Sequence, residues 1–191
     1  MRIIAGAWKG RALAAPPGQA TRPTADRVRQ ALFDMLAHAE WGGPRLLHGA
    51  RVLDAFAGTG ALGLEALSRG AVHASFFETD RAARQVLARN IAACAATAAI
   101  HADATRPPPG TPCRLVFLDP PYHQNLGLRA LAALAAAGWI AEAAVIVLET
   151  ARDEPPPVAD LLARRDHGAA LLSIFRYRST PPEQPLDLAP G

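Results

Sequence analysis

The stretch of sequence that says most about the fold is Val52-Leu53-Asp54-Ala55-Phe56-Ala57-Gly58-Thr59-Gly60-Ala61-Leu62-Gly63. It predicts a buried strand over residues 51–55, a turn over residues 58–60 and a helix over residues 61–69. Residues 58–63 spell G-x-G-x-x-G, a pattern whose glycines let the backbone approach a bound nucleotide closely. A strand, a glycine turn and a helix in this order are typical of an α/β fold with a parallel sheet.

The alternation of strands and helices continues beyond this unit. Short apolar runs predict further strands, and helical periodicity predicts helices between them. The predicted strands are 74–78, 98–102, 115–119, 144–149 and 171–178, with a short partner for the last near 163–166, and the predicted helices are 81–93, 126–137 and 158–164. We therefore expect an α/β, Rossmann-like fold with a mostly parallel seven-stranded sheet and helices on both faces.

A second stretch, Leu115-Val116-Phe117-Leu118-Asp119-Pro120-Pro121-Tyr122, ends a buried strand abruptly. Because proline cannot donate a backbone hydrogen bond to a neighbouring strand, the strand must end at Asp119. The Asp119 carboxylate and the Pro120 carbonyl can both accept hydrogen bonds from an exocyclic amine, and Tyr122 can stack on a flat base. We predict that Asp119, Pro120 and Tyr122 form the catalytic group.

Carboxylates also follow the other predicted strands. Asp54 lies in the first stretch, Glu78 comes twenty residues after Gly58, and Asp103 ends the third strand. Because parallel strands end at a common edge, these groups are expected to surround one ligand that contains adenosine. The predicted cofactor-binding residues are Asp54, Gly58, Thr59, Gly60, Glu78 and Asp103.

The choice lies between a nicotinamide dinucleotide and S-adenosylmethionine, because both bring an adenosine whose ribose needs an acceptor. The negative charge of Asp54 suits a cationic methionine group and would oppose a pyrophosphate. A hydride-transfer enzyme also has no evident use for acceptors aimed at an amine. The sequence favours S-adenosylmethionine, and Gly60→Val is expected to abolish its binding by filling the space beside the ligand.

The N-terminal region is strongly basic. Residues 1–30 carry six basic side chains against one acidic side chain, whereas the whole chain has a net charge of +3. We predict a hairpin over residues 2–13 and a helix with Thr24 as its N-cap and with exposed arginines, which together would meet phosphate groups of a nucleic acid. The predicted nucleic-acid-binding residues are Arg2, Lys9, Arg11, Arg22, Arg27 and Arg29.

The composition of the 191 residues bounds the remaining possibilities. We expect a basic N-terminal extension over residues 1–40, a catalytic domain over residues 41–178 and a disordered, proline-rich tail over residues 179–191. Cys94 and Cys113 have no CxxC or histidine spacing around them, which favours a reducing compartment and no metal. The longest apolar run is too short for a membrane span, so we expect a cytoplasmic protein, and nothing requires more than a monomer.

Several motifs of the chain resemble one known family. Residues 54–60 and 119–122 resemble the cofactor and catalytic motifs of class I S-adenosylmethionine-dependent amino-methyltransferases. With residues 2–4, 8–11, 22–29 and 54–70, the chain resembles more narrowly the bacterial 16S ribosomal RNA guanine-N2 methyltransferases of the RsmD type. The resemblance covers residues 1 to 150, with departures at Ala5, where a glycine is expected, and at Gln30, where a glutamate is expected.

The resemblance implies transfer of a methyl group from S-adenosylmethionine to the exocyclic N2 of one guanine in 16S rRNA of the small ribosomal subunit. It implies that Asp54, Gly58 and Gly60 hold the methionine end of the cofactor. Glu78 would hold the ribose and Asp103 the adenine. Asp119 and Tyr122 would engage the guanine, and the basic residues of the N-terminal extension would bind RNA.

Other readings stay open at this stage. A DNA adenine-N6 methyltransferase would use the same acceptors on a different amine, and a glutamine-N5 protein methyltransferase would more usually carry asparagine in place of Asp119. A non-catalytic RNA-binding assembly factor and an NAD-dependent oxidoreductase are less favoured. The residues also leave open the target nucleotide, whether the RNA is naked or in an assembled subunit, and whether Asp119 takes the proton or only orients the amine.

Overall fold

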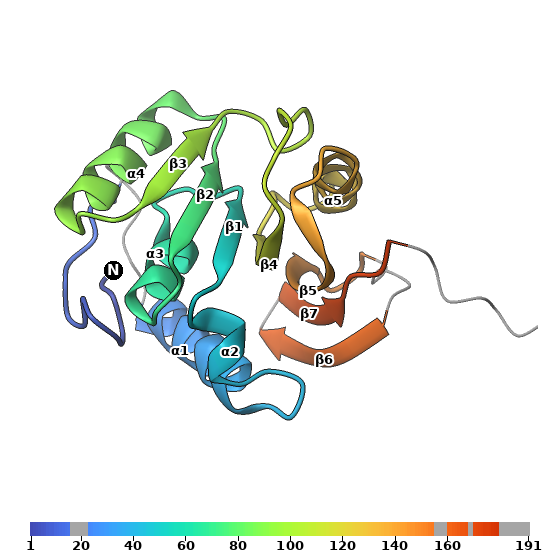
Figure 1. Ribbon diagram of the computed structural model, residues 1–191, viewed down its shortest axis with the longest axis horizontal. Coiled ribbons are helices and arrows are strands. Elements are labelled where there is room, and N and C mark those ends of the chain that lie inside the picture. The colour runs from blue at the N-terminus through green and yellow to red at the C-terminus, as the bar shows by residue number, and fades with distance from the viewer. Residues whose placement is uncertain (16–22, 155–159, 168–169, 180–191) are drawn as a thin grey trace, which may run out of the picture.

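The computed structural model describes residues 1–15, 23–154, 160–167 and 170–179. These residues surround one seven-stranded sheet with the strand order β3-β2-β1-β4-β5-β7-β6 (Figure 1). The strands are β1 (Arg51–Ala55), β2 (His73–Phe77), β3 (Ala98–His101), β4 (Cys113–Leu118), β5 (Ile140–Ala151), β6 (Asp160–His167) and β7 (Ala170–Arg176). The predicted α/β fold and its seven strands are confirmed.

The central strands are parallel and end at a common edge of the sheet. β1 pairs in parallel with both β2 and β4, and β4 pairs in parallel with β5. In this register Ala55 lies opposite Leu118, and Leu118 lies opposite Leu148. The residues that directly follow these positions are therefore neighbours at the edge where α/β folds bind their ligands.

Helices cover both faces of the sheet. They are α1 (Pro23–His38), α2 (Pro44–Leu47), α3 (Ala61–Ser68), α4 (Arg81–Ala93) and α5 (Leu126–Ala136). One hydrophobic cluster joins Val52 and Phe117 to residues of α1 to α4, and the other joins Leu53 and Val116 to Leu134 of α5. Adjacent residues of each strand thus enter opposite layers of the core, as expected for a sheet covered on both faces. Within the described ranges, no helix is long and apolar enough to cross a membrane.

The far end of the sheet is antiparallel. β7 pairs antiparallel with both β5 and β6, so the sheet is mixed. The short strand expected near residues 163–166 is confirmed as part of β6, but the helix expected over residues 158–164 is wrong, because β6 begins at Asp160. Apolar residues in that short segment suit either structure, and pairing with β7 decides between them.

The N-terminal segment turns back on itself before α1. Arg2 and Ala12 form an antiparallel bridge, and the Ile3 N–H donates to the Arg11 carbonyl over 2.9 Å. The predicted hairpin is confirmed in outline, although it contains a single bridge and no regular strand. Helix α1 begins at Pro23, so Thr24 lies inside its first turn and the expected N-cap at Thr24 is wrong. Proline is well suited to this first position, because it lacks an N–H and an N–H there would have no partner within the helix.

A buried carboxylate anchors the N-terminal segment to α3. Glu65 has no exposed surface and accepts hydrogen bonds from the backbone N–H groups of Ile4 and Ala5, over 2.7 and 3.0 Å. Ser68 donates to the Ala5 carbonyl over 2.6 Å. A Cβ on Gly6 would lie 1.8 Å from the Ser68 carbonyl oxygen, so only glycine permits this close approach. The segment is therefore fixed on the helix that follows the glycine turn.

Candidate cofactor and substrate site

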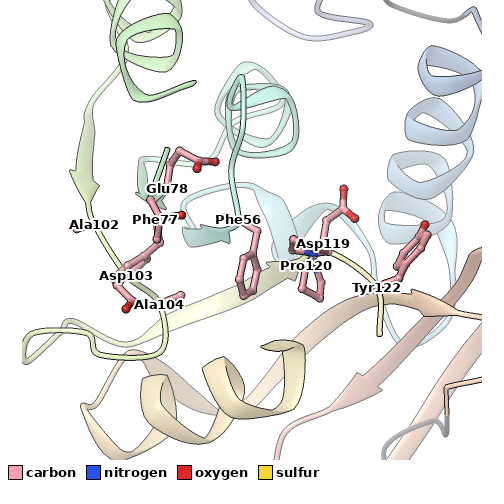
Figure 2. A pocket seen from close by; sticks show the side chains of 11 residues that line it. Phe56, Phe77, Glu78, Ala102, Asp103, Ala104, Asp119, Pro120 and Tyr122 are labelled. Carbon is pink, nitrogen blue, oxygen red and sulfur yellow. The ribbon is translucent and has the colours of Figure 1, made fainter. Parts of the chain in front are cut away.

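Two adjoining cavities lie at the carboxyl ends of the parallel strands. The smaller has a volume of about 380 Å³ and the larger about 590 Å³. They share Phe56, Asp119 and Tyr122. Figure 2 shows the Phe56 ring between the Asp103 side and the Asp119 side of the smaller cavity. The arrangement provides two compartments that meet at the Asp-Pro-Pro-Tyr segment.

The two glycines of the turn differ in their surroundings. Gly58 and Gly60 both have positive φ angles, of 54° and 80°, which favour glycine. A Cβ on Gly60 would lie 2.4 Å from a Leu87 methyl group in the core, whereas a Cβ on Gly58 would meet nothing within 4 Å. The reason given for Gly60→Val is therefore wrong: the added side chain would disrupt the core under the turn, and Gly58 is the glycine with open space beside it.

Thr59, between these glycines, lies in the wall of the larger cavity and is largely buried. Its hydroxyl donates to the Met1 sulfur over 3.4 Å, and its carbonyl accepts from the Asn90 amide over 2.9 Å. Asn90 also exchanges hydrogen bonds with the backbone of Ala14. The turn is thus held from below by α4 and linked to the N-terminal segment.

Glu78 and Asp103 line the smaller cavity, as the sequence predicts for an adenosine site. Glu78 follows β2 and accepts hydrogen bonds from the N–H groups of Gly58 and Asp80, each over 2.8 Å and each at a different oxygen. Each carboxylate oxygen can accept two hydrogen bonds, so each retains one free acceptor position. This spacing of acceptors suits the two hydroxyls of a ribose.

Asp103 follows β3 and is held by its own loop. Its Oδ1 accepts from the N–H and the hydroxyl of Thr105, and its Oδ2 accepts from Arg106 Nε over 3.1 Å. The bond from the Thr105 hydroxyl is the largest reason why the pKa of Asp103 lies below its usual range. The carboxylate is charged at neutral pH, and Oδ2 still has room for one more donor, such as an adenine amine.

Asp54 lies beneath the turn, between the cavities and the core. It is 2% exposed, and its Oδ2 accepts a hydrogen bond from the Gly63 N–H over 2.9 Å. Burial raises the pKa of Asp54 to about 8, and the negative charges of Asp119 and Glu78 act in the same direction. The charged form of Asp54 is thus costly in the free protein, and a cation bound in the larger cavity, which Asp54 lines, would stabilise it.

Asp119 lies where the two cavities meet. Its side chain is open to the cavities, yet protein atoms surround it, and the resulting desolvation raises its pKa to about 7, with a further contribution from the charge of Glu149. Tyr122 donates its hydroxyl hydrogen to Glu149 Oε1 over 2.5 Å. Burial and this bond raise the pKa of Tyr122, so the phenol stays protonated.

Among the cavity-lining residues that the predicted site did not include are Phe56, Met1 and Glu149. Glu149 could have been found, because it is the last residue of the strand predicted over residues 144–149, and carboxylates at strand ends were the signal used elsewhere. Phe56 lies in the quoted motif and has a positive φ angle of 68°. No pattern in the sequence indicates that Met1 reaches the cavity.

The basic residues of the N-terminal extension fall into two groups. Arg2, Lys9 and Arg11 are exposed on the hairpin, and Arg27 is exposed on α1. Arg29, expected to be exposed, is 6% exposed, and this expectation is wrong. It donates to the Arg2 carbonyl over 2.6 Å and pairs with Asp26 over 3.0 Å, because the N-terminal segment covers that side of the helix.

The remaining predictions concern Arg22, the C-terminal tail, metal binding and the two cysteines. Arg22 and residues 180–191 of the expected tail lie outside the described residues. Among the residues that the structure does describe, no three histidine, cysteine, aspartate or glutamate side chains cluster as metal ligands would, and Cys94 and Cys113 are buried free thiols.

Known proteins share both the sequence and the fold of this chain. A family model described as "Conserved hypothetical protein 95" matches residues 1–176. Ribosomal RNA small subunit methyltransferase D of Escherichia coli K12 is 42% identical over 154 residues, which are 78% of this chain and 74% of that protein. The protein of the same name from Haemophilus influenzae is 38% identical over 163 residues, 81% of each chain.

Solved structures agree with these sequence matches. The Escherichia coli protein yhhF has a TM-score of 0.81 and 37% identity, and the match covers 94% of this chain and 99% of that one. A Thermus thermophilus 16S rRNA N2 G1207 methyltransferase, solved with AdoMet and guanosine, has a TM-score of 0.62 at 19% identity over 85% of this chain and 45% of that one, which shows a shared fold. By sequence and by structure, the chain belongs to the family of ribosomal RNA small subunit methyltransferase D.

Proposed function

We propose that this protein transfers a methyl group from S-adenosylmethionine to the exocyclic N2 of one guanine in 16S rRNA of the small ribosomal subunit. The observation that carries the proposal is the Asp119-Pro120-Pro121-Tyr122 segment at the junction of the two cavities. The names of the relatives support a small-subunit ribosomal RNA as substrate. The Thermus thermophilus structure, with AdoMet and guanosine bound on the same fold, supports the cofactor and the base.

The smaller cavity fits the adenosine part of the cofactor. Its walls combine apolar surface from Phe56, Phe77 and Ala104 with the carboxylates of Glu78 and Asp103. Apolar walls suit a flat adenine ring, and the free acceptor positions suit the ribose hydroxyls and the adenine amine. The open space beside Gly58 lets the cofactor lie against the backbone of the turn, and the charge of Asp54 complements the cationic methionine end.

The acceptors around Asp119 prepare the amine for attack. The guanine amine is a poor nucleophile because its lone pair is delocalised into the ring. The Asp119 carboxylate and the Pro120 carbonyl would orient the two N–H bonds so that the lone pair points at the methyl group, which S-adenosylmethionine supplies already activated by its positive sulfur. A new N–C bond forms as the S–C bond breaks, and the amine loses one proton. With its pKa near 7, Asp119 is suited to receive that proton.

The exposed cations of the N-terminal segment would contact RNA phosphates. Arg2, Lys9 and Arg11 lie on the hairpin, which Glu65 and Ser68 fix on α3. Phosphate contacts position a nucleic acid without reading its sequence. We propose that this extension, residues 1–40 of the chain, positions the RNA over the larger cavity, and that the protein acts as a cytoplasmic monomer.

The test identifies the methylated nucleoside directly. Purified protein is incubated with labelled S-adenosylmethionine and with small ribosomal subunits, bare 16S rRNA or DNA from cells that lack the gene. The nucleic acid is then digested and the labelled nucleoside is identified. We expect N2-methylguanosine from subunits or from 16S rRNA, and the comparison of the two shows which one is the substrate.

Two other outcomes would refute the proposal in different ways. N6-methyladenine in DNA would keep the fold and the cofactor but overturn the substrate. Binding of S-adenosylmethionine without label in any nucleic acid would instead indicate an assembly factor without catalysis. Asp119→Ala serves as the matched control, because it removes the acceptor and leaves Glu78 and Asp103 in the cofactor cavity.

A further inference from the structure

Glu149 lies beside Asp119, near the end of the neighbouring strand β5, two residues before that strand ends at Ala151. Leu118, the last residue of β4, pairs with Leu148 of β5 in parallel register, so Asp119 and Glu149 are the residues that directly follow this pair. Both side chains line the larger cavity. The charge of Glu149 contributes to the raised pKa of Asp119, which agrees with this proximity.

A hydrogen bond from Tyr122 orients the Glu149 carboxylate. The Tyr122 hydroxyl donates to Glu149 Oε1, which uses one acceptor position of the carboxylate and leaves Oε2 without a hydrogen-bond partner among the described residues. Tyr122 and Glu149 come from a loop and from a strand, and both face the cavity that Asp119 also lines. The hydrogen bond between them would place the Tyr122 ring on the face of a base and the Glu149 carboxylate at the edge of that base.

The charges of the larger cavity favour a ligand edge that donates hydrogen bonds. Its charged lining residues are Asp54, Asp119, Glu149 and Arg29. The Arg29 guanidinium donates from Nη2 to the Arg2 carbonyl and to Asp26 and keeps its other N–H groups, so three carboxylates face a single guanidinium in this cavity. Acceptors therefore dominate the cavity around Tyr122.

Guanine presents a matching set of donors. Its Watson–Crick edge carries the N1–H next to the exocyclic amine, whereas adenine carries an unprotonated N1 acceptor at that position. With Asp119 and the Pro120 carbonyl on the amine, a carboxylate one strand away would face N1. We propose that Glu149 accepts the N1–H of the target base and thereby selects guanine. This assignment rests on the proposed function and extends it from the reaction to the choice of base.

A second interpretation is that Glu149 only binds the Tyr122 hydroxyl. The two interpretations differ in one respect: only a residue that contacts N1 changes the preference between bases that differ at N1. The base 2,6-diaminopurine keeps the N2 amine of guanine but has an acceptor at N1 and an amine in place of O6, so it changes the recognised edge and leaves the reacting amine intact. A loss of the preference in Glu149→Gln then assigns that recognition to Glu149.

The experiment compares small subunits assembled with 16S rRNA that carries either guanine or 2,6-diaminopurine at the methylated position. Methylation rates are measured for the wild-type protein, for Glu149→Gln and for Glu142→Gln. Glu142 is a matched control, because it lies at the opposite end of the same strand β5, outside the larger cavity. Binding of S-adenosylmethionine and of both subunits is measured in parallel, so that a misfolded variant or altered docking of the RNA is recognised.

We expect the wild-type protein and Glu142→Gln to prefer guanine by about 30-fold, the size expected for one hydrogen bond to a charged group. In Glu149→Gln the preference should fall to within about threefold, because the amide can donate to N1 of diaminopurine as well as accept from guanine. Tyr122→Phe, which frees the Glu149 side chain, should give an intermediate preference.

Equal rates for the two bases with the wild-type protein would overturn the proposal. So would a preference that survives in Glu149→Gln, since another residue would then distinguish the two bases at N1 or at position 6. If the wild-type protein methylates neither base although it binds S-adenosylmethionine and both subunits, the proposed reaction itself is wrong. That failure is distinct from the first two, in which methylation at N2 continues.

Discussion

The carboxylates of the two cavities all lie at the carboxyl ends of parallel strands, but they differ in hydrogen bonding and in pKa. In the smaller cavity, Glu78 and Asp103 are held by N–H and hydroxyl donors from their own loops. In the larger cavity, Asp54 and Asp119 have few donors, and burial raises the pKa of both. All four residues share this position at the carboxyl ends of parallel strands. The difference in pKa therefore comes from the groups that surround each carboxylate.

This contrast separates binding from chemistry. A carboxylate that stays charged at neutral pH is a dependable acceptor for hydroxyl and amine groups of a ligand. A carboxylate whose charge is costly responds to a nearby cation or to a proton released near neutral pH. The site thus combines a binding half, at β2 and β3, with a reactive half, at β1 and β4.

The largest effect is expected from Asp119→Ala, which removes the reactive acceptor. The methylation rate should fall by about 10²- to 10⁴-fold, the usual contribution of a positioned base. The affinity for S-adenosylmethionine, measured by calorimetry, should change little, because the adenosine half is intact. A rate close to that of the wild-type protein with cofactor bound would show that Asp119 has no part in the reaction.

Asp54→Asn should weaken cofactor binding while stabilising the free protein. The pKa of Asp54 is about 8 in the folded state, against an ordinary value of 3.8, so between pH 4 and 8 the folded state holds a proton that the unfolded state lacks. The wild-type protein therefore loses stability as the pH rises through this window, and the variant does not.

The measurement is the free energy of unfolding at pH 5 and pH 8. At pH 5 the variant and the wild-type protein should be similar, whereas at pH 8 the variant should be more stable by on the order of 3 kcal/mol. Its affinity for S-adenosylmethionine should fall about tenfold, because a neutral amide attracts the cation less. A difference in stability that is the same at both pH values would contradict the assigned titration.

Glu78→Gln tests the binding half of the site. The amide has a single acceptor oxygen, so it cannot accept from both Gly58 and Asp80 and also bind a ribose hydroxyl. We expect S-adenosylmethionine to bind about tenfold more weakly, which corresponds to one lost hydrogen bond to a charged group. The rate at saturating cofactor should stay near that of the wild-type protein. A large fall in that rate would show that Glu78 takes part in the reaction as well as in cofactor binding, which contradicts the proposed division of the site.

The smallest effect is expected from the pH dependence of the reaction. If ionised Asp119 is required, kcat/KM for the RNA should rise with pH, with a midpoint near 7. Glu149→Gln removes a negative charge that raises this pKa, so its midpoint should lie at lower pH. A flat profile between pH 6 and 8 would mean that Asp119 only orients the amine.

Much of the site could be predicted because it depends on local patterns and one rule of topology. Asp54, Glu78, Asp103 and Asp119 were found because strands are visible as apolar runs and parallel strands end at one edge. The strand before Asp103 is poor in large apolar residues, and β3 has no large fully buried side chain. The structure gives the reason, because β3 is the edge strand of the sheet and is therefore less fully covered.

The remaining features depend on contacts between distant parts of the chain. Arg29 was expected to be exposed because nothing near it indicates that residues 2–5 and Glu65 would cover it. The segment around residues 160–164 could form a helix or a strand until β7 provides its partner. The raised pKa values of Asp54 and Asp119 likewise come from burial, which only the packed structure defines.

The hydrogen bonds between Glu65 and the N-terminal segment determine the order in which these two parts can fold during synthesis. Its partners Ile4 and Ala5 precede it by about 60 positions, so the first basic residues leave the ribosome with nothing to dock on. At about 5–20 residues per second, the anchor is synthesised roughly 3–12 seconds later. The cationic N-terminal segment therefore has no helix to dock on until α3 has been synthesised and folded.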